Sequence, residues 1–321
     1  MKLSVFAVLL QDKPFDEACK ILSECGAQAV EIGCGGYPGK AHCDPKDFLA
    51  HPEKIDAMLA SLKKYNLEIA ALSTHGNAVH PNKEIAKQFH DDFENAVLLA
   101  EKIGVDTIVT FSGCPGGSPE DKTPNWVTCA WPEDYQQIKK YQWEEVLIPY
   151  WQNEAKFAAA HGIKKIAFEM HPGFCVYNPE TLLRLREAVG DIIGANFDPS
   201  HLFWQGIDPV AAIRHLGPAL YYFHAKDTKV DEINTAINGV LDTKPLSDAT
   251  GRSWLFRSVG YGHAHQMWKD MMSELRKIGY DGFISIEHED MLMIPMEGLK
   301  KAISMLKDVM IFEGIGDIWW A

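Results

Sequence analysis

Residues 165–169 read Lys-Ile-Ala-Phe-Glu and begin a series of four short apolar runs that each end in an acidic residue or a histidine. The other three runs are Gly-Ala-Asn-Phe-Asp at 194–198, Tyr-Tyr-Phe-His at 221–224 and Phe-Ile-Ser-Ile-Glu at 283–287. Runs of this kind predict strands that are covered on both faces, as in a parallel sheet. Their polar end residues reach the rim of that sheet, where they can converge on one divalent metal.

Strand-like and helix-like segments alternate along the whole chain. The helical segments are amphipathic, as in Ile85, Phe89, Phe93 and Val97, which recur at every fourth residue. Eight strands that are each followed by a helix predict an α/β fold, a single-domain (β/α)8 TIM barrel over residues 1–321. An open doubly wound sheet shows the same alternation, but no Gly-x-Gly-x-x-Gly turn follows the first strand. The predicted strands are 2–8, 28–33, 67–73, 105–111, 164–169, 192–198, 219–224 and 282–287.

Two connections are longer than the others, at 112–132 after the fourth strand and at 225–265 after the seventh. Both follow the carboxyl end of a strand, the face where barrel enzymes carry out their chemistry, so we expect lids or substrate-binding loops. Trp126 and Trp131 lie in the first connection. They suit either stacking on a sugar face or the interface of a homo-oligomer.

The composition excludes several classes of partner. A net charge of −13 argues against nucleic acid and against an anionic membrane surface, because both bind Lys and Arg. No apolar run approaches the roughly 20 residues that span a bilayer. The seven cysteines include no Cys-x-x-Cys pair, which predicts reduced thiols in a cytoplasmic protein. The apolar N-terminus is followed at once by Gln-Asp-Lys-Pro, which favours a first strand over a signal peptide.

The residues that end the four runs also indicate which metal they bind. Three carboxylates and one imidazole favour Mn²⁺, with Mg²⁺ or Co²⁺ as substitutes, over zinc held by Cys or several His. Three negative charges against two positive charges leave the site slightly anionic and suited to a neutral polyol. A single acid at a strand end is commonly a helix cap or a salt-bridge partner, but four in succession favour a metal site. The predicted ligands are Glu169, Asp198, His224 and Glu287.

Five motifs around these residues carry a family resemblance. They are Phe-Glu169-Met-His171-Pro, Asp198-Pro-Ser-His201, His224-Ala-Lys226-Asp227, Arg257-Ser-Val-Gly260-Tyr-Gly262 and Ile-Glu287-His-Glu. In this order, and over essentially the whole chain, they resemble the xylose isomerase-like superfamily and its sugar phosphate isomerase/epimerase branch. That branch includes ketose 3-epimerases, inosose dehydratases and enzymes that act on 3-keto-glycosides. The resemblance implies a small carbohydrate substrate, a metal on the four strand-end residues, and substrate contacts from His201 and Arg257.

The resemblance implies a metal-dependent sugar isomerase or epimerase that works through a metal-stabilised enediolate. Glu169 and Glu287 would lie on opposite sides of the keto-sugar and transfer the proton between its faces. His201 is the third catalytic candidate, and it would hold or move a hydroxyl proton unless its role is structural. The alternative is a lyase, in which a β-oxygen leaves the same enediolate. This route covers inosose-type dehydration and β-elimination of a 3-keto-glycoside, with His171 or His263 as the general acid.

The chain departs from the family in ways that bear on the substrate. Ketose 3-epimerases carry a further Glu after the first metal Glu, whereas residues 170–175 read Met-His-Pro-Gly-Phe-Cys, so His171 takes the polar place. His75, His263 and Lys226 are further candidates for substrate contacts. Lys226 suits equally an ion pair with Asp227 that orients His224.

Two other functional classes share parts of this pattern. Apurinic endonucleases have the same fold but need additional histidines, including one at the end of the fourth strand. That end reads Thr-Phe-Ser-Gly at 110–113, and the net charge is wrong for DNA, so a nuclease is excluded. A non-catalytic sugar-binding barrel would have no need of both Glu169 and Glu287.

Overall fold

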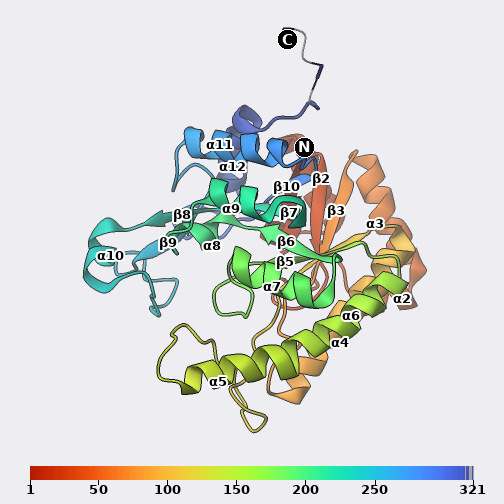
Figure 1. The fold of residues 1–321 in the computed structure, drawn as a ribbon. Helices are drawn as coiled ribbons and strands as arrows, with labels where there is room; N and C mark the ends of the chain where they lie inside the picture. Colours follow the sequence, from red (N-terminus) through yellow and green to blue (C-terminus); the bar gives the residue numbers. More distant parts are fainter. Residues whose placement is uncertain (315, 318–319, 321) are drawn as a thin grey trace.

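Eight parallel strands close into a barrel at the centre of the computed structural model, which describes residues 1–314, 316–317 and 320 (Figure 1). Around the barrel the order is β1-β10-β7-β6-β5-β4-β3-β2, so β5, β6, β7 and β10 are consecutive neighbours. Each predicted strand range coincides with one barrel strand to within two residues at either end, and the (β/α)8 TIM barrel is confirmed. The strands are β1 (Lys2–Phe6), β2 (Ala29–Gly33), β3 (Glu68–Ser73), β4 (Thr107–Thr110), β5 (Lys165–Glu169), β6 (Ile193–Phe197), β7 (Leu220–Ala225) and β10 (Phe283–Ile286).

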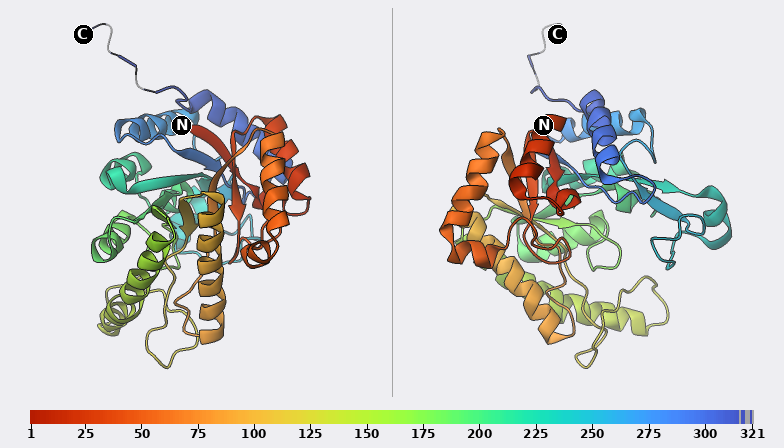
Figure 2. Two further views of the ribbon diagram at one scale, coloured as in Figure 1. Left: turned by 90° about the vertical axis from the view of Figure 1, so that its right-hand side faces the viewer. Right: turned by 180° about the vertical axis from the view of Figure 1, so that it is seen from behind.

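The helices lie outside the strands and form the outer layer, which Figure 2 shows in two further views. Gly26 and Gly104 end α1 and α4 in the left-handed conformation that glycine adopts readily. Among the described residues, no helix combines the length and the apolar character needed to cross a membrane. The helices of this layer are α1 (Phe15–Cys25), α2 (Pro45–Ala50), α3 (Pro52–Lys64), α4 (Lys83–Ile103), α5 (Asp134–Lys140), α6 (Ile148–Ala160), α7 (Pro179–Val189), α8 (Pro199–Phe203), α9 (Pro209–Leu216), α11 (His265–Lys277) and α12 (Pro295–Val309). Two short 3-10 helices are η1 (Ala7–Leu10) and η3 (Gly217–Ala219), and the π-helix η2 (Tyr141–Leu147) lies between α5 and α6.

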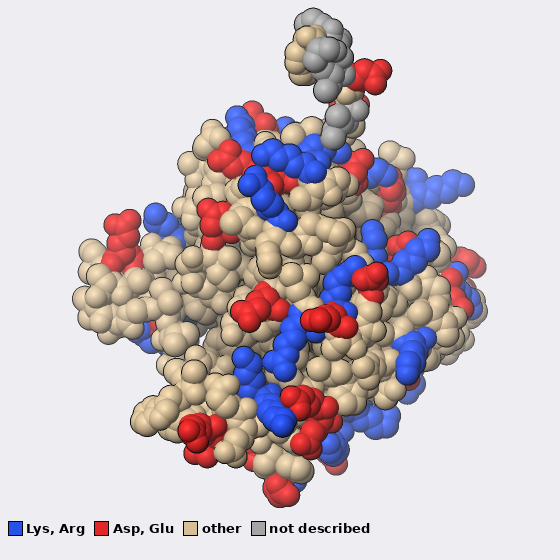
Figure 3. Space-filling model, viewed as in Figure 1, with Lys and Arg blue, Asp and Glu red and all other residues tan. Residues whose placement is uncertain are grey.

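The barrel strands have an apolar outer face and a partly polar inner face. Side chains alternate between the two faces of a strand, and in β2 the buried Val30 and Ile32 belong to the main apolar core between strands and helices. Glu31 between them is fully buried and therefore points into the barrel. On the molecular surface in the view of Figure 3, basic side chains lie among acidic ones.

The two long connections differ from each other in structure. Residues 112–132 form no helix or strand; Trp126 packs edge-on against Tyr177 and Trp131 is 78% exposed, so both predicted roles of the tryptophans stay predictions. The connection 225–265, predicted as a loop, instead contains the antiparallel strands β8 (Asp227–Val230) and β9 (Trp254–Arg257), with α10 (Glu232–Asn238) between them. This arm projects from the barrel (Figure 1). Trp254 anchors it by stacking on Trp204, with ring centroids 4.7 Å apart.

Candidate active site and metal centre

The four predicted ligands meet at the carboxyl ends of four neighbouring strands. Glu169 is the last residue of β5, Asp198 follows β6, His224 lies near the end of β7, and Glu287 follows β10. One ligand atom from each residue lies within 4.8 Å of the other three. The side chains of Glu169, Asp198 and His224 are at most 3% exposed, whereas that of Glu287 is 17% exposed. The strands therefore place a buried three-carboxylate, one-imidazole cluster at the mouth of the barrel.

Two atoms of this cluster are suited to a cation. Nδ1 of His224 and Oδ2 of Asp198 are buried and have no hydrogen-bond partner within the described part of the chain, although the ammonium of Lys226 lies 3.0 Å from Oδ2 as an ion pair. Nδ1 of His224 lies 3.3 Å from Oε2 of Glu169 and 3.3 Å from Oε2 of Glu287. Buried polar atoms without such partners are uncommon in folded proteins. A divalent ion coordinated by these atoms would satisfy them, so the residues present fit a metal.

Glu31, which the sequence analysis missed, orients the imidazole ligand. This fully buried carboxylate of β2 accepts a hydrogen bond from Nε2 of His224 at 2.9 Å. The hydroxyl groups of Ser73, Tyr222 and Ser285 also donate to it. With its Nε2 proton held by Glu31, His224 turns Nδ1 toward the other ligands, and a metal bound there would take the place of a proton on Nδ1. The available signal was a single charged residue within the apolar run Ala-Val-Glu-Ile-Gly at 29–33.

Replacing Glu31 with Gln is expected to weaken metal binding by about ten- to a hundredfold, as loss of such an outer carboxylate does elsewhere. The amide carries no charge to hold the His224 ring and its tautomer. Metal titration against a competing chelator measures the change. The control is Glu68→Gln, because Glu68 is exposed and pairs with Lys2 at the opposite end of the barrel strands. Wild-type metal affinity in the Glu31 variant would contradict this role.

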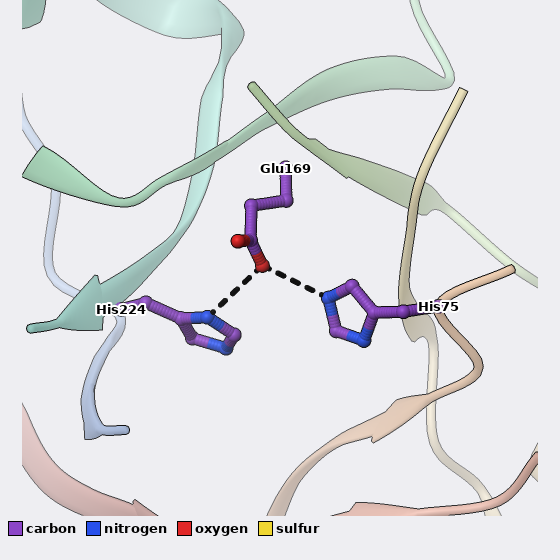
Figure 4. A group of neighbouring side chains, drawn as sticks. All are labelled: His75, Glu169 and His224. Carbon is purple, nitrogen blue, oxygen red and sulfur yellow. Dashed lines mark hydrogen bonds and ion pairs between the residues drawn. The ribbon is translucent and has the colours of Figure 1, made fainter. Parts of the chain in front are cut away.

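Glu169 is the most heavily hydrogen-bonded of the four ligands. His201 Nε2 lies 2.9 Å from its Oε1, and His75 Nε2 lies 3.0 Å from its Oε2. The amide of Asn196, a residue that the sequence analysis also missed, donates to the same Oε2 at 3.2 Å. Figure 4 shows the Glu169 carboxylate between the rings of His75 and His224. Burial acts to raise the pKa of Glu169, but the surrounding imidazoles lower it well below its ordinary value.

Lys226 is buried against the same acidic cluster. Its ammonium nitrogen lies 2.7 Å from Glu287 Oε2, 2.8 Å from Glu289 Oε2 and 3.0 Å from Asp198 Oδ2. Burial acts to lower the pKa of Lys226, but these carboxylates raise it well above its ordinary value. The alternative of an ion pair with Asp227 is therefore wrong. Lys226 contacts two of the candidate metal ligands directly.

This lysine also changes the charge balance of the site. Three carboxylate ligands and a divalent ion leave one negative charge, which the ammonium of Lys226 cancels. The expectation of a slightly anionic centre stays a prediction, because Lys226 adds a positive charge beside Asp198 and Glu287 whereas Glu31 adds a negative charge beside His224. With a metal bound these charges nearly balance, which suits an uncharged polyol better than a polyphosphate.

The remaining predicted residues divide into two groups. His171 lies inside the site, with its ring centroid 4.0 Å from that of His201. Arg257 and His263 are held by acids outside the ligand set, Asp290 at 3.1 Å and Asp227 at 2.8 Å. Asp227 also accepts hydrogen bonds from the backbone amides of residues 260, 262 and 263. Substrate contacts from Arg257 and His263 thus stay predictions; in the structure Asp227 holds His263 and the turn at 260–263, whereas Asp290 holds Arg257.

Comparison with known proteins gives the same family as the sequence motifs. The family of xylose isomerase-like TIM barrels matches residues 19–309. The protein YfiH of Bacillus subtilis (strain 168) is 39% identical over 309 residues, which cover 96% of this chain and 98% of YfiH. An inosose dehydratase of Mesomycoplasma hyopneumoniae (strain J) is 27% identical over 309 residues, covering 93% and 89%. The solved structure of the IolI protein with a zinc atom has a TM-score of 0.66 at 18% identity, covering 96% of this chain and 98% of that one. This chain belongs to the xylose isomerase-like TIM barrel family.

Proposed function

We propose that this chain is a divalent-metal-dependent sugar isomerase or epimerase, which removes the proton next to the ketone of a keto-sugar and returns it. The observation that carries the proposal is the convergence of Glu169, Asp198, His224 and Glu287 within 4.8 Å. Two of these residues are glutamates that can also transfer a proton. The family supplies the sugar-processing context, since its relatives include an inosose dehydratase.

The four converging residues would hold the metal. Their oxygen-rich set favours Mn²⁺, with Mg²⁺ or Co²⁺ as substitutes, although the IolI structure contains zinc. When bound, the ion supplies a Lewis acid that polarises the ketone and makes the neighbouring C–H bond more acidic. We place the enzyme in the cytoplasm, where its seven free cysteines stay reduced.

The protein's own groups then move the proton. Burial acts to raise the pKa of Glu287, but the ammonium of Lys226 lowers it well below its ordinary value. Glu169 is likewise ionised at neutral pH, so either carboxylate can accept the proton from carbon. In the proposed reaction one glutamate takes the proton from one face of the sugar and the other returns a proton to the opposite face. His201, which is hydrogen-bonded to Glu169, holds the hydroxyl group of the sugar next to the reacting carbon.

Elimination is the second candidate, and the position of His171 favours it. After the C–H bond breaks, a carbon–carbon double bond forms, the bond to a β-oxygen breaks, and that oxygen takes a proton. His171 lies beside His201 and can supply this proton. Burial lowers the pKa of His171, so its protonated form is a stronger acid but a smaller fraction of the molecules at neutral pH carry it, and elimination would be faster at lower pH. Dehydration of an inosose and cleavage of a 3-keto-glycoside both follow this scheme.

Metal removal in deuterated water tests both candidates. Chelator-treated protein is expected to lose turnover of keto-sugars and to regain it with Mn²⁺, because the polarising charge is then restored. The substrates are free ketoses, inososes and 3-keto-glycosides, with products followed by NMR. Deuterium in an intact, inverted sugar identifies an epimerase, and loss of water or an aglycone identifies a lyase. A protein that exchanges no proton with any of them is a sugar-binding barrel, contrary to the proposal.

A further inference from the structure

A second group of metal-ligand side chains lies outside the barrel, between the helices α4 and α6. It comprises His90 and Glu94 of α4 and Glu154 of α6, and one ligand atom from each lies within 4.8 Å of the other two. The rings of Phe93 and Trp151, with centroids 5.4 Å apart, pack the two helices together at this level (Figure 1). This cluster shares no residue with the candidate metal centre at the carboxyl ends of the strands.

The spacing along each helix brings these side chains to one place. Residues four apart lie on the same face of an α-helix, so His90 and Glu94 share the face of α4 that meets α6. Tyr150 and Glu154 form the corresponding pair on α6, and the hydroxyl of Tyr150 forms a hydrogen bond with Nδ1 of His90 at 3.2 Å. A separation of four residues is also the one at which two ligands of a single helix bind zinc.

Both carboxylates approach the imidazole without forming a hydrogen bond to it. Oε1 of Glu94 lies 3.6 Å from Nε2 of His90, and Oε1 of Glu154 lies 3.6 Å from Nδ1. Both distances are too long for a hydrogen bond. Two ligands of a tetrahedral zinc ion, each about 2.0–2.2 Å from the metal, lie roughly 3.3–3.6 Å apart. The observed separations are therefore close to those of ligands around one ion.

Glu154 is the residue that most needs a cation. Its side chain is 7% exposed, and its Oε2 has no hydrogen-bond partner within the described part of the chain. Among the described residues, neither Glu154 nor Glu94 forms an ion pair with a lysine or an arginine. Burial and the charge of Glu94 raise the pKa of Glu154 to about 7. Buried glutamates are rare unless they are paired, and a divalent ion would cancel both negative charges.

We propose that His90, Glu94 and Glu154 form a second metal site, which binds one Zn²⁺ ion and links α4 to α6. One imidazole with two carboxylates favours zinc over Mn²⁺ or Mg²⁺, because imidazole suits the later transition metals. The side chains of His90 and Glu94 are 33% and 37% exposed, which leaves a path from solvent and room for a water molecule as fourth ligand. The inference does not rest on the proposed function, because it uses no residue of the strand-end cluster.

Counting bound zinc tests this site. At a Zn²⁺ concentration that just saturates wild type, equilibrium dialysis of the full chain is expected to show one ion fewer per chain in the Glu154→Gln variant. Loss of a ligand is expected to weaken the site by at least about a hundredfold, the upper end of what loss of an outer partner costs. Because the result is a difference of one ion, it does not depend on whether the strand-end cluster also binds zinc.

Two further variants make the test specific. Glu94→Gln is expected to lose the same ion, and because Glu94 is partly exposed its replacement leaves the packed interior unchanged. The matched control is Glu101→Gln, because Glu101 also lies on α4 but forms an ordinary ion pair, 2.8 Å from His161 at the end of α6. Zn²⁺ is expected to raise the Tm of this control more than that of Glu154→Gln. Equal numbers of zinc ions, bound with equal affinity, in wild type and in both cluster variants would overturn the proposal.

Discussion

Replacing Glu169 with Gln is expected to abolish turnover at every metal concentration, whereas Asp198→Asn is expected to act mainly by weakening metal binding. Glu169 is proposed both to bind the metal and to transfer the proton. Its amide replacement cannot accept a proton from carbon, and loss of a positioned base alone lowers a rate by about 10²–10⁴-fold. His75, His201 and Asn196 also hydrogen-bond to the two carboxylate oxygens of Glu169, and a Gln side chain offers only one acceptor oxygen in their place.

Asp198 provides the matched control within the same cluster. It is fully buried and contributes one oxygen to the candidate ligand set, while its other oxygen accepts a hydrogen bond from the backbone amide of Ser200. We assign it no proton to move, so excess Mn²⁺ is expected to restore much of the activity of the Asp198→Asn variant. Turnover measured against Mn²⁺ concentration for both variants separates the two roles. Recovery of the Glu169→Gln variant at high Mn²⁺ would show that Glu169 is a ligand only.

The barrel and the candidate ligands follow from local sequence patterns. A short apolar run that ends in Glu, Asp or His carries its information within five residues, and parallel closure then brings such ends together. This is why the amino-acid sequence alone is enough to pick out Glu169, Asp198, His224 and Glu287. Their convergence within 4.8 Å matches that expectation.

The outer partners of the site depend on contacts between distant strands. Glu31 meets His224 across the barrel interior, at a separation of 193 residues, and no local pattern encodes that pairing.

The partner of Lys226 was misjudged for a different reason. Residues 224 and 226 share a face of the chain, but 226 and 227 point to opposite faces. Asp227 is therefore adjacent in sequence but bonds the turn at 260–263 instead. The β8–β9 arm likewise depends on the contact of Trp254 with the distant Trp204.

Removing the charge of Lys226 is expected to make the stability of the fold depend on metal. In the Lys226→Met variant, Asp198, Glu287 and Glu289 lose the cation that they share. Breaking a buried ion pair by removing one partner costs about 3–5 kcal/mol, a large part of the roughly 5–15 kcal/mol that stabilises a typical protein. Bound Mn²⁺ would replace part of the missing positive charge. Denaturant unfolding with chelator and with saturating Mn²⁺ measures both effects.

The comparison with a surface lysine makes this experiment specific. Lys301 pairs with Glu297 at 3.3 Å on the exposed face of α12, and Lys301→Met is expected to change the free energy of unfolding by no more than about 1 kcal/mol. Because metal binds only the folded cluster, the gain in stability on adding Mn²⁺ should be larger for Lys226→Met than for wild type or Lys301→Met. Equal gains in all three proteins would mean that the ammonium does not offset the charge of the metal ligands. The role of Lys226 in offsetting the charge of Asp198 and Glu287 would then be wrong, and protons would have to neutralise these carboxylates instead.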